Sequence, residues 1–468
     1  MSSTFRVGWA TADITPPLPV LLCGQLYERR CTEVRDSLNA TVLAMEQVDG
    51  DGESQSTVIV SCDLIGIQAH VQEAVREAVS RAVPCVDTSR LFMAATHIHT
   101  GPYTADRLEH LPAAGAVSEG ITSGATYTRV LVERVCRAVV TAWKARRPAG
   151  VAFALGRAVI GLNRRIVYHD GRAVMYGETD TAEFKGLEGP SDSGIELMYV
   201  FDDTGDMTGV AVNVACPAQV LEHTSRISAD FWGDVRRLAS ERLGPRVTVL
   251  PLPAAAGDQS PRDLVRSGAG EPDMHGDTGA LEIAARIVTA VERELHIARE
   301  RIEYAPVLEH VTERIDLPLR TVTDQQVSRA HRDLEELAAT PGEHAVSFAN
   351  QHAGIEKFYA DGIIARADLQ KRTSTFSMEL HAVRIGRCML VTNPFECFLE
   401  YGLRIKARCP APHVMTVQLA CDNGGYLPTA AAVQGGGYSS QVANGFVGPG
   451  GGDALVEKSV ELASLLYT

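Results

Sequence analysis

The stretch LFMAATHIHTGP (residues 91–102) decides how the chain folds around its most informative side chains. Leu91–Ala95 is an apolar run that predicts a buried strand, which ends abruptly at the polar run Thr96–Pro102. In an extended chain, residues i and i+2 point to the same side. His97 and His99 are therefore expected to project into one pocket, a spacing that many zinc sites use. Because a bare H-x-H also occurs by chance, two ordinary turn histidines are the alternative.

The segments on either side of this stretch alternate strands with helices. STVIVS (56–61) predicts a β-branched strand, Val71–Val83 has the apolar stripe of a helix, and a long amphipathic helix is expected over about Ala125–Trp143. This rhythm predicts a mixed α/β (α+β) fold with mixed, largely parallel sheets layered with helices. Ligands gather at the carboxyl ends of strands in such sheets, so Asp63, after the first strand, is a candidate substrate contact.

The alternation continues to the C-terminus. Further strands are expected at 151–155, 196–201, 209–215, 246–252, 305–320 and 376–392, and further helices at 231–243, 279–301, 323–339 and 453–466. Residues 341–371 are the least regular stretch and are interpreted as a lid or a surface excursion. Since no repeat or low-complexity linker interrupts the chain, one domain over residues 1–468 is the simplest organisation.

Composition and charge restrict the classes of function. A hydrophobic content of 45% with 22% charged residues is that of a globular protein. The net charge of −14 argues against nucleic acid and against anionic membranes as partners. Residues 1–12 lack the apolar core of a secretory signal, and the ten cysteines include no C-x-x-C pair. We therefore expect a cytoplasmic protein with reduced thiols and a small-molecule substrate.

Two C-terminal segments contain candidate metal ligands. Glu396, in NPFE (393–396), follows the apolar run CMLV (388–391), and a carboxylate at a strand end is well placed to bind a metal ion. Tyr426 and Tyr438 lie in a glycine-rich segment. Tyrosines in such loops more often pack than bind metals, so residue type alone does not select them.

Two central segments add further candidates. GDQSP (257–261) follows a predicted strand; Ser260 there is a possible nucleophile or substrate contact, and Asp258 a residue that orients a neighbour, with a tight turn as the alternative. No G-x-S-x-G elbow is present, which leaves serine-hydrolase chemistry unsupported. His223 precedes the helix at 231–243, a position where a lone histidine is commonly structural.

These fragments, in this order, resemble the catalytic domain of the neutral (non-lysosomal) ceramidase family. The matching stretches are VGWATADITPP (7–17), VSCDLIGI (60–67), THIHTGP (96–102), ISADFWG (227–233), AAGDQSP (255–261), NPFE (393–396) and GGYLPT (424–429). The resemblance spans nearly the whole chain and rests on several ordered motifs.

The resemblance implies one zinc ion per chain, held by two histidines, a glutamate and a tyrosine. Carried over by position, it makes His97, Glu396 and Tyr426 ligands and His99 the general base that deprotonates a zinc-bound water. The family's second histidine ligand has a proline close behind it. Here Cys216 runs directly into a proline, and His223, seven residues further on, is the nearby histidine that takes the ligand's place.

The resemblance also assigns the remaining catalytic roles. Tyr438 stabilises the oxyanion, Arg164 lies near the carbonyl, and Ser260 contacts substrate; Asp258 joins Asp63 as a candidate substrate contact. The implied activity is zinc-dependent hydrolysis of an amide. Family members that cleave ceramide have an added immunoglobulin-like domain and are secreted or membrane-associated, so a small or medium non-ceramide substrate is expected.

Two other functions fit the same residues. One is intramolecular amide or lactam formation, and the other is zinc-stabilised binding without turnover. Substrate identity is expected to depend on the divergent segments 104–124, 166–195 and 341–371.

Overall fold

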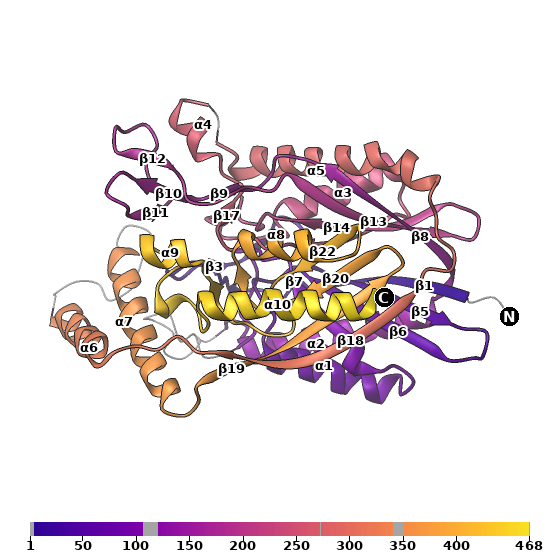
Figure 1. The fold of residues 1–468 in the computed structure, drawn as a ribbon, viewed down its shortest axis with the longest axis horizontal. Coiled ribbons are helices and arrows are strands. Elements are labelled where there is room, and N and C mark those ends of the chain that lie inside the picture. Colours follow the sequence, from indigo (N-terminus) through magenta and orange to yellow (C-terminus); the bar gives the residue numbers. More distant parts are fainter. Residues whose placement is uncertain (1–3, 106–119, 272, 340–350, 468) are drawn as a thin grey trace.

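The computed structural model describes residues 4–105, 120–271, 273–339 and 351–467. Two sheets pack face to face, and helices cover both outer surfaces (Figure 1). One hydrophobic cluster lies between the sheets, with Phe92 and Leu390 among its members. A second lies between the larger sheet and its helices, and a third beneath the helices of the smaller sheet. The two sheets are therefore buried on both faces.

The larger sheet has eight strands. Its two edge strands lead into the segments that contain His97 and Gly257. In spatial order the eight strands are β16 (Thr248–Pro253), β14 (Met207–Val214), β13 (Gly194–Asp202), β8 (Arg147–Arg157), β1 (Thr4–Asp13), β5 (Asn39–Val48), β6 (Ser54–Cys62) and β7 (Leu91–Ala95). Its outer face is covered by α1 (Ala69–Ala82), α2 (Gly124–Lys144), α3 (Phe231–Leu243) and α5 (Gly276–Arg299).

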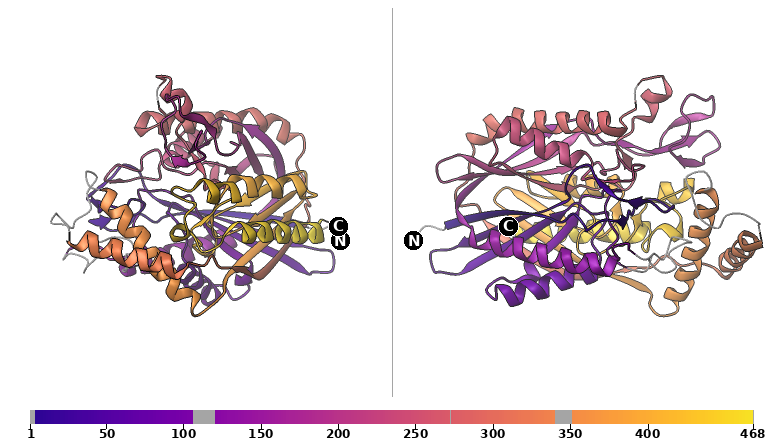
Figure 2. Two further views of the ribbon diagram at one scale, coloured as in Figure 1. Left: turned by 60° about the vertical axis from the view of Figure 1, so that its left-hand side comes forward. Right: turned by 180° about the vertical axis from the view of Figure 1, so that it is seen from behind.

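The smaller sheet consists of β18 (Leu308–Pro318), β19 (Thr375–Ile385), β20 (Cys388–Thr392) and β22 (His413–Val417), in that order. α8 (Leu399–Arg408) and α10 (Pro449–Leu466) pack on its outer face. α6 (Asp324–Ala339), α7 (Gln351–Gln370), α9 (Ala430–Gly435) and the small sheet of β10 (Arg165–Tyr168), β11 (Ala173–Met175) and β12 (Phe184–Leu187) gather at the end of the molecule opposite the N-terminus (Figures 1 and 2).

The predicted mixed α+β class is confirmed, but the expectation of largely parallel sheets is wrong. Only β6–β7, β14–β16 and β20–β22 pair in parallel within the two main sheets; the other neighbours are antiparallel. Three of these antiparallel pairs, β5–β6, β13–β14 and β19–β20, are joined by short turns, which can only return the chain antiparallel.

Several expected elements have the predicted bounds, including β7 and α3. Two central strands, β1 and β5, were not predicted at all. The stretch predicted to be irregular contains the helix α7 instead. The sequence pattern missed this helix because its apolar residues do not form the single stripe that signals a helix. Residues 341–350 of that stretch lie outside the described part of the chain.

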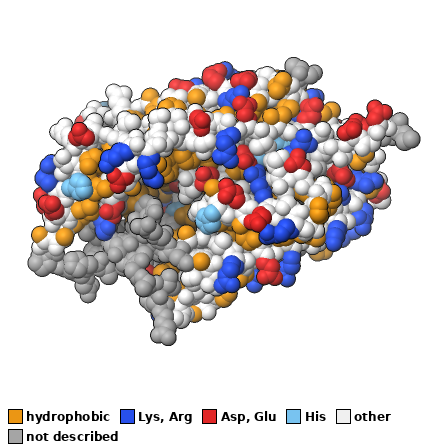
Figure 3. Space-filling view, turned by 90° about the horizontal axis from the view of Figure 1, so that it is seen from below, with side chains coloured by type: hydrophobic (Ala, Val, Ile, Leu, Met, Phe, Trp, Pro, Cys, Tyr) orange, Lys and Arg blue, Asp and Glu red, His pale blue; other side chains and the backbone are white. Residues whose placement is uncertain are grey.

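The surface carries both basic and acidic side chains, as expected for a sequence with 44 Lys and Arg and 58 Asp and Glu residues. On the face shown in Figure 3, basic and acidic side chains are interspersed and neither sign forms a continuous patch. Among the described helices, none combines the length and apolar character needed to cross a membrane. All ten cysteines are free thiols, and most of them are buried.

Asp63 joins α3 to the ends of two strands of the larger sheet. Its carboxylate accepts two hydrogen bonds from Arg236 on α3, at 2.7 and 2.9 Å, and one from the backbone N–H of Asn39 at 2.8 Å. Thr96 donates to the same carboxylate from the end of β7. Asp63 is fully buried by these partners, so the structure places it in a structural network that holds the strand before His97.

We expect Asp63→Asn to lower the free energy of unfolding by about 3–5 kcal/mol, because it leaves the Arg236 guanidinium without its buried counter-charge. Urea unfolding followed by circular dichroism measures this loss. Glu241→Gln, which removes an exposed carboxylate that pairs with Arg237 on the same helix, is the control and should leave the midpoint unchanged. Equal midpoints for both variants would contradict the structural role of Asp63.

Candidate functional site

His97 follows β7 in a backbone conformation that few side chains adopt. Its φ is 64°, in the left-handed region, where a non-glycine residue costs about 1–3 kcal/mol. The ring Nδ1 lies 2.7 Å from the carbonyl oxygen of Ile65. Since a carbonyl only accepts, Nδ1 carries the proton of the neutral ring and Nε2 has the lone pair. Backbone strain and this hydrogen bond together aim that lone pair away from the strand.

The atom facing this lone pair is a carboxylate oxygen. Nε2 of His97 lies 3.2 Å from Oε2 of Glu396, and both side chains are largely buried. Two electron-rich acceptors at this distance repel each other unless a proton or a metal ion lies between them. The pair is therefore arranged to hold a cation.

Glu396 and Tyr426 are brought together by a short parallel pairing. β21 (Glu396–Cys397) lies beside β23 (Tyr426–Leu427), with Glu396 directly opposite Tyr426. Burial raises the pKa of the Glu396 carboxyl, but the hydrogen bond from Tyr426 and the positive charge of Arg164 stabilise the carboxylate and help to hold that pKa below its usual range. The Tyr426 oxygen is thus a third potential ligand on the same side of the site.

Close packing beneath Glu396 depends on Gly257. A Cβ at this glycine would lie 2.2 Å from the carbonyl oxygen of Glu396 and 2.7 Å from its carbonyl carbon. The backbone N–H of Gly257 also donates to the carbonyl oxygen of Cys397. The GDQSP segment therefore supports β21 through direct backbone contact, which only glycine allows.

Arg164 places a buried positive charge beside the three potential ligands. One terminal nitrogen, Nη2, donates to the hydroxyl of Tyr426 and to the carbonyl of Gly257, each at 3.0 Å. The other, Nη1, donates to Oε1 of Gln219 at 3.3 Å. Among the described residues, no carboxylate forms an ion pair with Arg164, so its charge remains available to a substrate oxygen.

The ring of His99 lies against that of His97, and the proton of the His99 ring is on Nδ1, the nitrogen that faces away from His97. Because Arg164 can only donate, Gln219 turns its oxygen toward Arg164 and its amide nitrogen toward His99, whose Nε2 accepts at 2.7 Å. Nδ1 then carries the proton, and it faces Oε2 of Glu222 at 3.6 Å. Nε2 of His99, with its lone pair, lies 3.4 Å from Nε2 of His97.

Burial keeps His99 neutral. Its pKa is well below the usual value, first because the ring is desolvated and then because the guanidinium groups of Arg29 and Arg164 add positive charge nearby. A neutral imidazole is the form required of a general base, and its single lone pair, at Nε2, accepts from Gln219 in this structure.

Tyr438 packs beside Tyr426. The two rings are 5.6 Å apart, edge to face, and their hydroxyls are hydrogen-bonded. The carbonyl oxygen of Tyr438 accepts from Arg165 at 2.6 Å, and Arg165 in turn makes two hydrogen bonds to Glu188, at 2.6 and 2.9 Å. A fully buried guanidinium therefore fixes the loop that presents Tyr438.

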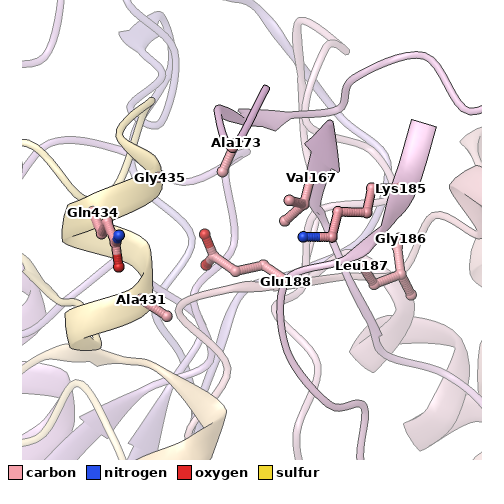
Figure 4. Close-up of a pocket in the computed structure, with 10 residues that line it drawn as sticks. Val167, Ala173, Lys185, Gly186, Leu187, Glu188, Ala431, Gln434 and Gly435 are labelled. Carbon is pink, nitrogen blue, oxygen red and sulfur yellow. The ribbon is translucent and has the colours of Figure 1, made fainter. Parts of the chain in front are cut away.

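Glu188 also borders a cavity of about 440 Å³ between the β10–β12 sheet and α9 (Figure 4). Lys185 and Gln434 line its two sides. The cavity is lined by residues of the divergent segment 166–195 and of α9, and Arg165 links its residue Glu188 to the carbonyl oxygen of Tyr438. Sequence patterns gave no indication of Arg165 or Glu188, because an arginine–glutamate pair separated by more than twenty residues has no local signature.

Ser260 and Asp258 are buried behind Arg164. The Tyr176 hydroxyl donates to Oγ of Ser260 at 3.3 Å. Asp258 accepts from the backbone N–H of Leu399 and from the side chain of Asn163, both at 2.9 Å. Both carboxylate oxygens of Asp258 are thus engaged in joining α8 to the strand that precedes Arg164.

His223 lies in a different group from the other predicted ligands. Its Nδ1 is 3.2 Å from the hydroxyl of Tyr27, and its Nε2 is 3.7 Å from Oε1 of Glu222. Glu222, His223 and His275 bring their ligand atoms within 4.8 Å of one another. The structure thus brings His97, Glu396 and Tyr426 together and places His223 beside Glu222 and His275.

The chain resembles known proteins in structure rather than in sequence. No protein-family model and no curated protein sequence matches it. The structure of the neutral ceramidase from Pseudomonas aeruginosa matches with a TM-score of 0.71 and 17% sequence identity, covering 100% of this chain and 75% of that chain. A ceramidase complexed with C2 matches with a TM-score of 0.72 and 16% identity, covering 99% and 75%.

The chain has the neutral ceramidase fold. The resemblance first seen in the ordered sequence motifs is therefore confirmed at the level of the fold. At these identities the likeness to the ceramidases establishes architecture, and the roles of individual side chains rest on the geometry described above.

Gly257→Ala is expected to displace Glu396, because the new methyl group would overlap the backbone carbonyl of β21. Overpacking of this kind costs about 1–3 kcal/mol or more. The melting temperature measured by intrinsic fluorescence should fall accordingly. Gly450→Ala is the matched control, because no atom lies within 4 Å of the Cβ added at this helical glycine. Its melting temperature should not fall below that of the wild type.

Proposed function

We propose that this chain is a zinc-dependent hydrolase that cleaves an amide bond in a small or medium-sized substrate other than ceramide. The observation that supports this most directly is the lone pair of His97 Nε2, held 3.2 Å from the buried carboxylate of Glu396. The likeness in fold to two ceramidase structures supports the hydrolase class.

The donor set fits zinc. An imidazole nitrogen, a carboxylate oxygen and a tyrosine oxygen are ligand types suited to this ion, and a catalytic zinc site characteristically has three protein ligands and one open position. We propose His97, Glu396 and Tyr426 as the three ligands. With three ligands the site does not require His223, which lies with Glu222 and His275. Bound there, zinc supplies a Lewis acid that acidifies water and polarises a carbonyl.

His99 is proposed as the general base. Its Nε2 accepts from the Gln219 amide and lies 3.4 Å from Nε2 of His97, so a water molecule beside His97 would reach this nitrogen by taking the place of the amide hydrogen. Gln219 holds the ring from one side, and Glu222 faces the Nδ1 proton from the other. His99 would take a proton from the attacking water at Nε2 and return it to the departing amine.

Arg164 and Tyr438 are proposed to stabilise the negative charge that develops on the carbonyl oxygen. Arg164 contributes a buried cation with no carboxylate partner among the described ion pairs, and Tyr438 a hydroxyl fixed by its neighbours. Preorganised donors of this kind act in a site that excludes bulk water, and removing one costs about 100-fold or more in kcat. Ser260, linked to Arg164 through Tyr176, is proposed to support Arg164 rather than to act as a nucleophile.

His97→Ala is expected to lose the zinc of this site, whereas His99→Ala and Tyr438→Phe should keep it and lose about 100-fold or more of the activity. Zinc is measured by elemental analysis, and activity as release of free amine from a panel of N-acyl amines and amides. His331→Ala, an exposed histidine on α6, is the control. Full activity in His99→Ala would identify the site as structural, and unchanged zinc in His97→Ala would reject the ligand set.

A further inference from the structure

Glu222, His223 and His275 form a second cluster of metal-ligating side chains, here called the Glu222 cluster. Glu222 and His223 lie in the loop between β14 and β15 (Arg226–Ile227), and His275 is the residue before α5. The two imidazole rings have centroids 5.8 Å apart, and all three ligand atoms lie within 4.8 Å of one another. Two imidazoles and one carboxylate are a donor set for divalent transition metals such as Zn²⁺, Mn²⁺ and Fe²⁺.

The carboxylate of the cluster is buried without a permanent cation. Glu222 is 8% exposed, and its ion pairs among the described residues are with His99 and His223. Gln25 donates to Oε2 at 3.2 Å. Burying a carboxylate costs folding free energy unless it is paired or binds a metal ion. The imidazoles of His99 and His223 can pair with Glu222 only through a proton or a metal ion.

Three guanidinium groups lie near the cluster, those of Arg29, Arg164 and Arg262, and among the described ion pairs none is with the Glu222 carboxylate. Arg29 donates through Nη1 to the backbone oxygens of Glu222 and Thr224, at 2.6 and 3.0 Å, and not to the carboxylate. Arg262 is paired with Asp273 at 2.6 Å. Their positive charge weakens cation binding, and the Asp273 carboxylate offsets part of it.

The cluster is open to solvent on one side. The side chain of His223 is 42% exposed and that of Glu222 is 10% exposed, with His275 intermediate. A metal ion can therefore enter past His223 and meet a carboxylate that is largely removed from water.

The inner side of the cluster faces the proposed general base. Glu222 turns Oε1 toward Nε2 of His223 at 3.7 Å and Oε2 toward Nδ1 of His99 at 3.6 Å. Nδ1 of His99 is buried and has no hydrogen-bond partner. A metal ion bound to Oε1 would hold the carboxylate so that Oε2 can accept the Nδ1 proton, as carboxylates do for metal-site histidines.

We propose that Glu222, His223 and His275 bind a second divalent transition-metal ion, next to the zinc site of His97 and Glu396. This ion does not replace the first. Its position places Glu222 between the ion and His99, and in this respect the proposal deepens the proposed function.

Metal stoichiometry tests the proposal. The full chain is stripped with a chelator, titrated with ZnCl₂ and analysed by isothermal titration calorimetry and elemental analysis after desalting. The wild type and the His331→Ala control should bind two equivalents. His223→Gln and His275→Ala should each bind one equivalent, at the His97 site. His97→Ala should bind one equivalent, at the Glu222 cluster, and the His97→Ala/His275→Ala double variant should bind no zinc. Circular dichroism confirms that each variant is folded, and His223→Gln changes a side chain exposed enough to be tolerated.

The outcomes separate this proposal from the proposed function. One equivalent in the wild type that is lost only with His97 overturns the second site, and so does wild-type stoichiometry in both His223→Gln and His275→Ala. One equivalent that is lost only with His223 or His275 supports the second site and rejects the first.

The link to His99 has its own measurement. In the zinc-loaded wild type, the Nδ1 proton of His99 should give a low-field ¹H resonance that is absent from His99→Ala. Loss or broadening of that resonance in His275→Ala supports the positioning by Glu222. An unchanged resonance in His275→Ala overturns the link to His99, independently of how many metal ions bind.

Discussion

The hydrogen bond from Nδ1 of His97 to the carbonyl of Ile65 is the interaction on which the site depends. It fixes which ring nitrogen has the lone pair, and the left-handed backbone of His97 fixes where that lone pair points. A buried carboxylate, that of Glu396, then faces it. Without this hydrogen bond the ring could present a proton to Glu396, and the pair would form an ordinary ion pair rather than a place for a metal ion.

The rest of the fold supplies rigidity around this pair. Glu396 is held by its parallel pairing with Tyr426 on one side and by backbone contact with Gly257 on the other. Asp63 ties the end of the strand before His97 to α3. Because both sheets are buried on both faces, these strand ends have little freedom, and a metal site requires ligands held to within a fraction of an ångström.

Glu222 connects two parts of the molecule that sequence patterns treat separately. It faces His99 with one oxygen and His223 with the other, so any ligand of the Glu222 cluster acts directly on the environment of His99. Gln219 has a similar position between His99 and Arg164, and its amide orientation follows from the donors of that arginine. Neither residue has a local signature, because a buried glutamine or glutamate acquires its role only from its spatial neighbours.

The sequence by itself determined the strand that ends at His97, the i, i+2 spacing of His97 and His99, and the order of motifs that predicted a ceramidase-like fold, since these depend on local pattern. It could not determine strand direction, and most neighbours in the two main sheets pair antiparallel, three of these pairs as hairpins. Tertiary structure alone decided that Tyr426 lies opposite Glu396 and that His223 lies beside His275. Those contacts join residues separated by tens of positions, and only the packing of the two sheets and their helices sets such distances.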